Sequence, residues 1–215
     1  MKVIISSAFN DEVIYFIEKY DLDIEKSENI FKINNNEVVL INTGVGKVNS
    51  AVNLEKAISK YKPDFIINSG CSGAIDSSLP IYGVIISDTV FYHDFSPINI
   101  MEKYMPEKGY MKADKKLINK AKEACQNLKI ENYTVGNIAT GDCYVTEKET
   151  VDKIKNMGAV TVDMESAALI HTAKINNVPF ISIRSISDFA NGKEVDEIEA
   201  SRKAAIITEE IVNNI

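Results

Sequence analysis

The segment Val178-Pro-Phe-Ile-Ser-Ile-Arg-Ser-Ile-Ser-Asp188 is the most strand-like part of the chain. Its β-branched and aromatic residues favour an extended backbone, and its apolar character predicts a buried strand over residues 178–186. Because successive side chains of a strand point to opposite faces, Arg184 and Asp188 are expected on the same side. The strand therefore brings a carboxylate to its carboxyl end.

Comparable short apolar segments alternate with helical patterns along the rest of the chain. This alternation predicts one α/β domain over residues 1–215, a three-layer αβα sandwich around a central mixed, largely parallel β-sheet. Sheets of this kind bind ligands at the carboxyl ends of their strands. The predicted strands are 2–6, 31–33, 38–41, 64–68, 83–91, 135–140 and 178–186, with a loop at 69–73, and the predicted helices are 12–20, 48–61, 113–127, 147–156, 164–175 and 195–213.

Composition excludes several classes of function. A 215-residue chain with 45% hydrophobic residues can bury one substantial core, and its net charge of −7 argues against a nucleic-acid or anionic-membrane surface. No apolar stretch approaches the roughly 20 residues that cross a bilayer, and no secretory pattern opens the chain. Three cysteines without a CxxC and two histidines offer no metal-ligand spacing, so we expect a cytoplasmic protein with reduced thiols and no metal.

Taken singly, the polar motifs have ordinary explanations. Gly44 and Gly46 fit neither a dinucleotide fingerprint, because Asn49 stands where a third glycine is needed, nor a P-loop, so a tight strand-to-helix turn is favoured. His93 and Asp94 could suggest a catalytic dyad, but adjacent residues at a strand end would point to opposite faces. A structural polar loop is therefore favoured there.

Three carboxylates are ambiguous when each is considered alone. Asp188 fits a general acid at a strand mouth, a helix cap or a loop salt bridge. Glu165 and Glu12 stand at the starts of predicted helices, where an acid stabilises the helix dipole.

Taken together, seven ordered segments resemble the 5′-methylthioadenosine/S-adenosylhomocysteine nucleosidases of the nucleoside phosphorylase superfamily. The resemblance covers nearly the whole chain, and its last two segments are the most specific. The segments are Ala8-Phe-Asn-Asp-Glu-Val13, Thr43-Gly-Val-Gly-Lys-Val48, Pro63-Asp-Phe-Ile-Ile-Asn-Ser-Gly70, Tyr92-His-Asp94, Ala139-Thr-Gly-Asp142, Val162-Asp-Met-Glu165 and Val178 through Asp188.

The resemblance implies a hydrolase that releases adenine. By the family's pattern Asp188 would protonate the imidazole-ring nitrogen of adenine, with Ser187 and Arg184 supporting the site. Glu12 would take a proton from the attacking water, and Glu165 would accept hydrogen bonds from the ribose hydroxyls. An acid beside the base and carboxylates near a cationic sugar are what cleavage of a nucleoside bond requires.

The same resemblance implies the remaining contacts. Met164 would pack on the sugar, Tyr144 would stack on the base, and the backbone of Val145 would read the purine edge. The other substrate-binding positions of the pattern are Phe9, Val45 and Cys71. It further implies a homodimer, a small nucleoside as the partner, and no cofactor.

Water is the expected nucleophile. The phosphorylase relatives hold phosphate with a glycine-rich loop and arginines near the N-terminus, whereas this chain has Ser6-Ser-Ala-Phe-Asn-Asp-Glu12 there and no arginine before Arg184. A purine nucleoside phosphorylase, a nucleosidase for another adenine-type nucleoside and a non-catalytic nucleoside-binding protein are the alternatives.

Two departures from the family bear on the substrate. Cys71 replaces a usual serine, with Ser72 adjacent to it, and the segment after Asp94, Phe95-Ser-Pro-Ile-Asn-Ile100, is shorter than in the family. That segment helps to form the 5′-substituent pocket and the dimer contact in the family, so the accepted 5′ group stays open.

Overall fold

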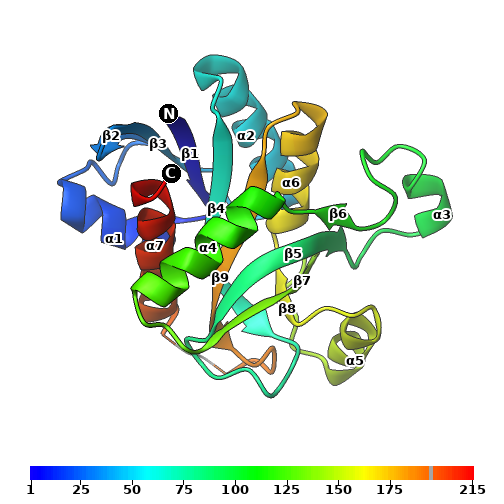
Figure 1. Ribbon diagram of the computed structural model, residues 1–215. Coiled ribbons are helices and arrows are strands. Elements are labelled where there is room, and N and C mark those ends of the chain that lie inside the picture. Colours follow the sequence, from blue (N-terminus) through cyan, green and yellow to red (C-terminus); the bar gives the residue numbers. More distant parts are fainter. Residues whose placement is uncertain (194–195) are drawn as a thin grey trace.

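Nine strands form one mixed sheet in the part of the chain that the computed structural model describes, residues 1–193 and 196–215 without the side chain of Ile98 (Figure 1). The strands are β1 (Lys2–Ser7), β2 (Glu28–Ile33), β3 (Asn36–Asn42), β4 (Phe65–Ala74), β5 (Val84–Tyr92), β6 (Met111–Lys112), β7 (Tyr133–Thr140), β8 (Thr161–Asp163) and β9 (Phe180–Asp188). The helices are α1 (Asn10–Tyr20), α2 (Lys47–Tyr61), α3 (Ile98–Met101), α4 (Lys115–Asn127), α5 (Lys148–Asn156), α6 (Ser166–Ile175) and α7 (Glu197–Asn213).

The sheet closes on itself over part of its width. β4 pairs with β8 and with β9, β8 pairs with β7, β7 with β5, and β5 with β9, which completes a ring. β1, β3 and β2 extend from β4, and β6 extends from β5. The prediction of an α/β domain with a mixed sheet is confirmed. The sheet departs from a strict three-layer sandwich because part of it closes on itself, and four pairings, β2/β3, β4/β8, β5/β6 and β5/β9, are antiparallel.

Closure depends on the length of β4. The predicted strand ended at residue 68 with a Gly- and Ser-rich loop over 69–73, whereas β4 continues to Ala74. The small residues of this second half of β4 leave room for neighbouring side chains. The strand residues beyond residue 68 pair with β8 on one side and with β9 on the other. The loop prediction is therefore wrong, and β8, only three residues long, was not predicted.

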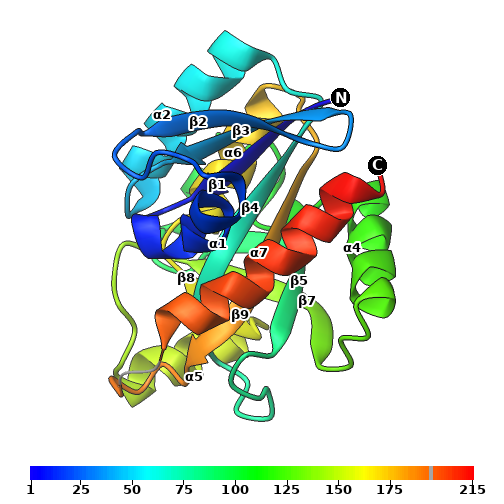
Figure 2. The ribbon, with the colours of Figure 1, turned by 90° about the vertical axis from the view of Figure 1, so that its left-hand side faces the viewer.

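Helices cover both faces of the sheet (Figure 2). Val3 and Ile5 of β1 belong to the apolar core under α1, α4 and α7, whereas the intervening Ile4 packs on the α2 and α6 side. This alternation is the period-two pattern of a strand buried on both faces. Burial of each such large side chain stabilises the fold by about 1.5–3 kcal/mol.

Most predicted helices are confirmed, with shifts at their ends. α6 begins at Ser166 rather than at residue 164, so Met164 and Glu165 precede the helix. The predicted helix over 195–213 is present from Glu197, and its first residue, Val195, lies outside the described residues. Asp196 caps α7, because its carboxylate accepts from the Glu199 amide at 3.0 Å.

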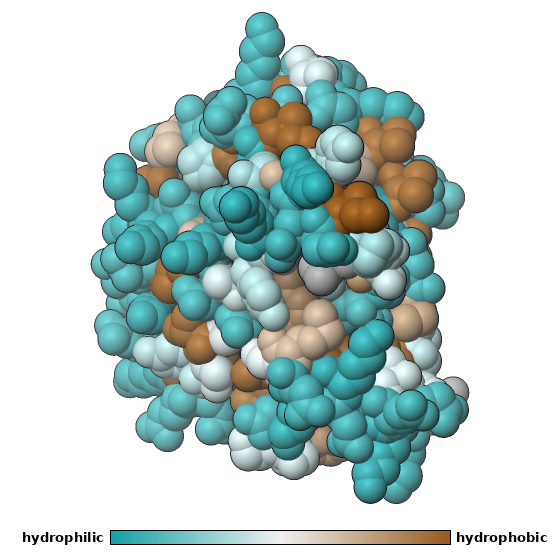
Figure 3. Space-filling view, turned by 90° about the vertical axis from the view of Figure 1, so that its right-hand side faces the viewer, coloured by the Kyte–Doolittle hydropathy of each residue, from teal (hydrophilic) through white to brown (hydrophobic). Residues whose placement is uncertain are grey.

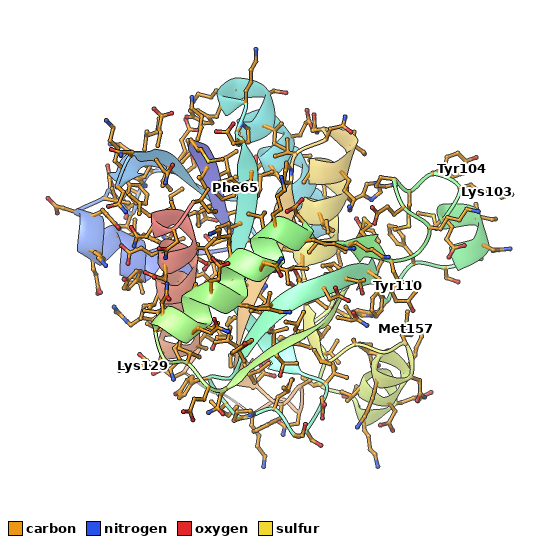
Figure 4. The ribbon with its side chains drawn as sticks, viewed as in Figure 1. Phe65, Lys103, Tyr104, Tyr110, Lys129 and Met157 are labelled. Carbon is orange, nitrogen blue, oxygen red and sulfur yellow. The ribbon has the colours of Figure 1, made fainter. Side chains whose placement is uncertain are left out.

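The connection between β5 and β6, which contains α3, projects from the sheet (Figure 1). Tyr104 in this segment is 80% exposed, while the Tyr110 hydroxyl donates to the Met157 carbonyl at 3.2 Å and ties the segment to the end of α5 (Figure 4). On this face of the molecule polar side chains predominate and the hydrophobic ones form separate small patches (Figure 3). Among the described residues, no helix combines the length and the apolar character needed to cross a membrane.

Candidate active site

A pocket opens at the carboxyl ends of several strands. All the predicted site residues except Arg184 line it, although they come from segments spread over most of the chain. The lining residues are Phe9, Glu12, Val45, Cys71, Ser72, Gly73, Cys143, Tyr144, Val145, Val162, Asp163, Met164, Glu165, Ser187, Asp188 and Glu197.

Arg184 lies behind the pocket wall and organises its acids. The side chain is 1% exposed, with Nε 3.0 Å and Nη2 2.8 Å from Asp163 Oδ2. Nη1 lies 3.1 Å from Glu12 Oε1, and Nη2 lies 3.5 Å from Glu165 Oε2. Burial opposes the charge of the guanidinium, but the three carboxylates outweigh it and raise the pKa of Arg184. One cation thus fixes the positions of three acids.

Glu12 occupies the first turn of α1 and is buried. Its Oε2 accepts from the Ala8 amide at 2.6 Å, and its Oε1 accepts from the Cys71 amide at 3.0 Å. Desolvation raises the pKa of Glu12, although Arg184 and the two amides oppose the rise. A raised pKa makes the carboxylate a stronger proton acceptor once it is ionised, which suits a general base.

Gly70 makes room for the Glu12–Arg184 pair. A Cβ atom at this position would overlap Glu12 Oε1 and Arg184 Nη1. Both side chains are buried and cannot move aside freely, so only glycine fits beneath the ion pair.

Asp163 joins three elements below the pocket. Its Oδ1 accepts from the Thr140 hydroxyl at 2.6 Å and from the Ser166 amide at 3.2 Å, and the Ser166 hydroxyl donates to Oδ2. The sequence analysis quoted Asp163 only as part of a motif and assigned it no role. Its position two residues before Glu165 was the available signal.

Glu165 precedes α6 and faces the pocket. Its Oε1 accepts from the Gly46 amide at 3.1 Å, and the residue is 6% exposed. Burial chiefly raises the pKa of Glu165 to about 8; Arg184 opposes the rise and Asp163 adds to it. The sequence interpretation of Glu165 as a first-turn acid is wrong in position, since the carboxylate contacts the start of α2 rather than its own helix.

Asp188 is the last residue of β9 and is also buried. The Ser187 hydroxyl donates to its Oδ2 at 2.9 Å, and the Ala190 amide donates to its Oδ1 at 2.7 Å. The pairing of β4 and β9 shifts register between Ser72 and Gly73, so simple alternation does not hold at the end of β9. For that reason the consecutive residues Ser187 and Asp188 both line the pocket.

The remaining lining residues differ in how far they are exposed to solvent. Tyr144 at the rim is 60% exposed, whereas Val145 beside it is buried. Cys71 lies in the pocket wall, and burial raises the pKa of its thiol to about 12, so the side chain is neutral. Glu197, the first residue of α7, was missed by the sequence analysis, because it lies outside every quoted motif.

The pocket is acidic throughout. Five of its described lining residues carry carboxylates and none carries a basic side chain; the acids are Glu12, Asp163, Glu165, Asp188 and Glu197. Such a wall stabilises a sugar that develops positive charge and disfavours an anion such as phosphate. Aliphatic and aromatic side chains complete the wall and suit a flat, neutral base.

Known proteins resemble this chain in sequence and in structure. The sequence profile of the phosphorylase superfamily matches residues 3–213. A 5′-methylthioadenosine/S-adenosylhomocysteine nucleosidase of Staphylococcus aureus is 38% identical over 182 residues, which is 82% of this chain and 79% of that protein.

Solved structures have the same fold. S-adenosylhomocysteine nucleosidase of Streptococcus pyogenes, in complex with 5-methylthiotubericidin, superposes with a TM-score of 0.88 at 28% identity over 100% of this chain and 97% of its own. Futalosine hydrolase of Helicobacter pylori gives a TM-score of 0.87 at 21% identity over 100% and 98%, and shares the fold. The chain belongs to the phosphorylase superfamily and, within it, to the 5′-methylthioadenosine/S-adenosylhomocysteine nucleosidases, which are N-glycosyl hydrolases.

Proposed function

We propose that this chain, acting as one domain over residues 1–215, hydrolyses the N-glycosidic bond of 5′-methylthioadenosine and S-adenosylhomocysteine, and that of 5′-deoxyadenosine, to release adenine. The observation that carries the proposal is the pocket in which Glu12, Glu165 and Asp188 converge without a basic side chain among the described lining residues. Family membership at 38% identity supports the same substrates.

Asp188 is the general acid in this proposal. As the glycosidic bond breaks, electrons move onto the purine, and a proton from Asp188 to a nitrogen of the imidazole ring turns adenine into a neutral leaving group. The Ser187 hydroxyl and the Ala190 amide hold the carboxyl group in one orientation. Fixed orientation is what a proton donor needs when the base is bound in one plane.

Glu12 is the general base and Glu165 the ribose ligand. The carboxylate of Glu12 takes a proton from water as that water attacks the anomeric carbon, so the hydroxyl goes to the sugar. Glu165 accepts hydrogen bonds from the ribose hydroxyls, and its partial charge stabilises the oxocarbenium character of the transition state. Arg184 touches neither substrate nor water in this scheme and positions both acids.

The remaining lining residues shape the site. Tyr144 stacks on the base, the Val145 backbone reads the purine edge, and Met164 packs on the sugar. Phe9, Val45 and Cys71 complete the wall. No described side chain of residues 95–110 lines the pocket within one chain, so this segment imposes no boundary on the 5′ substituent there.

We further propose a homodimer in the cytoplasm. Val48 and Val52 on α2 are exposed apolar side chains, at 73% and 48%, and α2 begins two residues after Val45 of the pocket wall, so this helix suits a subunit contact. All three cysteines are free thiols, as a reducing compartment favours. A monomer mass by light scattering at micromolar concentration would contradict the dimer.

The test is a panel of nucleosides with the wild type and Asp188→Asn, in which free adenine is measured over time. The wild type should release adenine from 5′-methylthioadenosine, S-adenosylhomocysteine and 5′-deoxyadenosine. Asp188→Asn should lose about 10²–10⁴-fold in kcat, the usual range for a general acid, with an unchanged melting temperature. Near-wild-type turnover in this variant would refute the assigned acid, and tight nucleoside binding without wild-type turnover would favour a binding protein.

A further inference from the structure

Lys47, the first residue of α2, lies behind the pocket with its side chain only 15% exposed, which is unusual for lysine. Its Nζ lies 2.5 Å from Asp94 Oδ2 and 3.5 Å from Asp142 Oδ2. The ammonium also lies 5.7 Å from the centre of the Tyr92 ring and 5.0 Å from that of Phe95. Lys47 therefore joins the start of α2 to the end of β5 and to the loop after β7.

Hydrogen bonds from backbone amides to carboxylates connect the cluster of Lys47, Asp94 and Asp142 to Glu165. Asp142 Oδ1 accepts from the Lys47 amide at 2.8 Å, and the Asp142 amide donates to Asp94 Oδ2 at 2.9 Å. The preceding amide, that of Gly46, donates to Glu165 Oε1. α2 has no acid in its own first turn and no side-chain cap from Gly46, so two carboxylates from distant segments take the place of a cap.

Two residues of this cluster adjoin the pocket lining in sequence. Asp142 immediately precedes the rim segment 143–145, and Gly46 immediately follows Val45. The hydroxyl of Tyr92 donates to the Ala167 carbonyl at 3.1 Å, which connects the cluster to α6 just after Glu165. A displacement of the Lys47 side chain would thus release the base-binding rim and the ribose ligand together.

We propose that Lys47 is a positioning residue of the nucleoside site. Its single positive charge attracts both Asp94 and Asp142 and so holds segment 143–145 and Glu165 at the spacing that fits base and sugar at once. Lys47 does not line the pocket and acts through these partners. The inference rests on the proposed nucleosidase function, because the base and the sugar are the groups being positioned.

The experiment compares Lys47→Met, which keeps the aliphatic stem, with Lys47→Arg and with a control on the same helix, Lys60→Met. Lys60 pairs with Glu28 near the other end of α2 and is remote from the pocket. Lys47→Met should raise KM for 5′-methylthioadenosine about tenfold, which corresponds to about 1.4 kcal/mol, with kcat within about threefold of the wild type. Lys47→Arg should recover most of the loss, and Lys60→Met should behave as the wild type.

Adenine binding by calorimetry is measured in parallel, because it requires no turnover. Lys47→Met should weaken adenine binding by a factor comparable to the rise in KM. An unchanged KM and adenine affinity in a folded Lys47→Met, or an equal loss in Lys60→Met, would overturn the proposal.

Asp142→Asn provides the test if Lys47→Met does not fold. Its side chain is 47% exposed, so the substitution removes the charge with little change in packing. The same rise in KM is expected, and a wild-type KM and adenine affinity in this variant would overturn the role of the cluster. A wild type that binds adenine yet releases none from any nucleoside would count against the proposed function and not against Lys47.

Discussion

At Gly70 the ion pair of the pocket leaves no room for a side chain. β4 passes directly beneath the Glu12–Arg184 ion pair, and any Cβ there would overlap both side chains. Gly70→Ala should displace Glu12, the proposed general base, and lower kcat/KM on the order of 10²-fold or more, with a loss of about 1–3 kcal/mol in the free energy of unfolding from overpacking. Steady-state kinetics measures the loss of kcat/KM, and urea unfolding measures the loss of stability. Wild-type kinetics in this variant would show that activity does not require Glu12 to be held above Gly70.

Glu165 makes the stability of the protein depend on pH. Burial raises its pKa from 4.5 to about 8, so between these values the folded state holds a proton that the unfolded state has lost. Stability should therefore be greatest at low pH within this window and should fall as pH rises through the folded pKa. Glu12, whose pKa is also raised, contributes with the same sign.

Glu165→Gln tests this dependence. The variant should be more stable than the wild type near pH 8 by on the order of 1–3 kcal/mol, and the difference should shrink toward pH 5. Its adenine release should fall at the same time, because the proposed ribose ligand is lost. Urea unfolding at several pH values provides the measurement, and parallel stability curves for the two proteins would contradict the assignment.

At the scale of elements, α1 and α7 are joined by one buried carboxylate. Glu209 of α7 accepts from the Tyr15 hydroxyl at 2.5 Å, from Lys19 Nζ at 2.6 Å and from the Tyr20 hydroxyl. Burial would raise the pKa of Glu209, but Lys19 and the two tyrosines outweigh it and lower the pKa. This cluster fixes α1, whose first turn carries Glu12, against the helix that begins at Glu197.

Glu209→Gln should lower the free energy of unfolding at pH 7 by about 1–3 kcal/mol, since hydrogen bonds to a charged group are lost in a buried site. Because the folded pKa of Glu209 is depressed, this contribution is present above the unfolded pKa and is lost as pH falls through the folded pKa. The matched control is Glu210→Gln on the exposed side of α7, where the partners are Asn127 and Asn214. Equal effects of the two substitutions would refute the special role of Glu209.

Strands and helices with a clear hydrophobic pattern were predictable from the sequence, and those without such a pattern were not. β1 and β9 show apolar, β-branched runs, and the amphipathic pattern of α2 predicts its helix to the last residue. The second half of β4 reads as a loop because Ser and Gly have low strand propensity, and only pairing with β8 and β9 on either side makes it extended. β8 is too short for any pattern to be visible.

The same distinction applies to the site. That Glu12, Glu165 and Asp188 line one pocket was predictable, because the ordered motifs of the family contain all three. The contacts of Arg184 with three acids and the role of Asp163 were not predictable. These residues come from separate segments of the sequence and meet only in the folded protein, so no sequence pattern indicates the cluster. Glu197 and the register shift beside Asp188 depend on how α7 and β4 pack against β9.

At the scale of the whole molecule, the closed part of the sheet assembles the pocket. β4 and β9 supply residues 71–73 and 187–188, β8 supplies Val162 and Asp163, and the segments after β1, β3 and β7 supply further lining residues. The lining residues come from different parts of the chain, so the complete pocket requires the folded sheet. The acids gathered there define the central claim, which is that water rather than phosphate attacks the nucleoside.

The most direct measurement is the identity of the sugar that accompanies adenine from 5′-methylthioadenosine, determined by mass in phosphate-free buffer and in saturating phosphate. The account predicts equal rates of adenine release in both buffers, with free 5-methylthioribose as the sugar product in each. Adenine release that depends on phosphate, with a sugar 1-phosphate as the product, would contradict it.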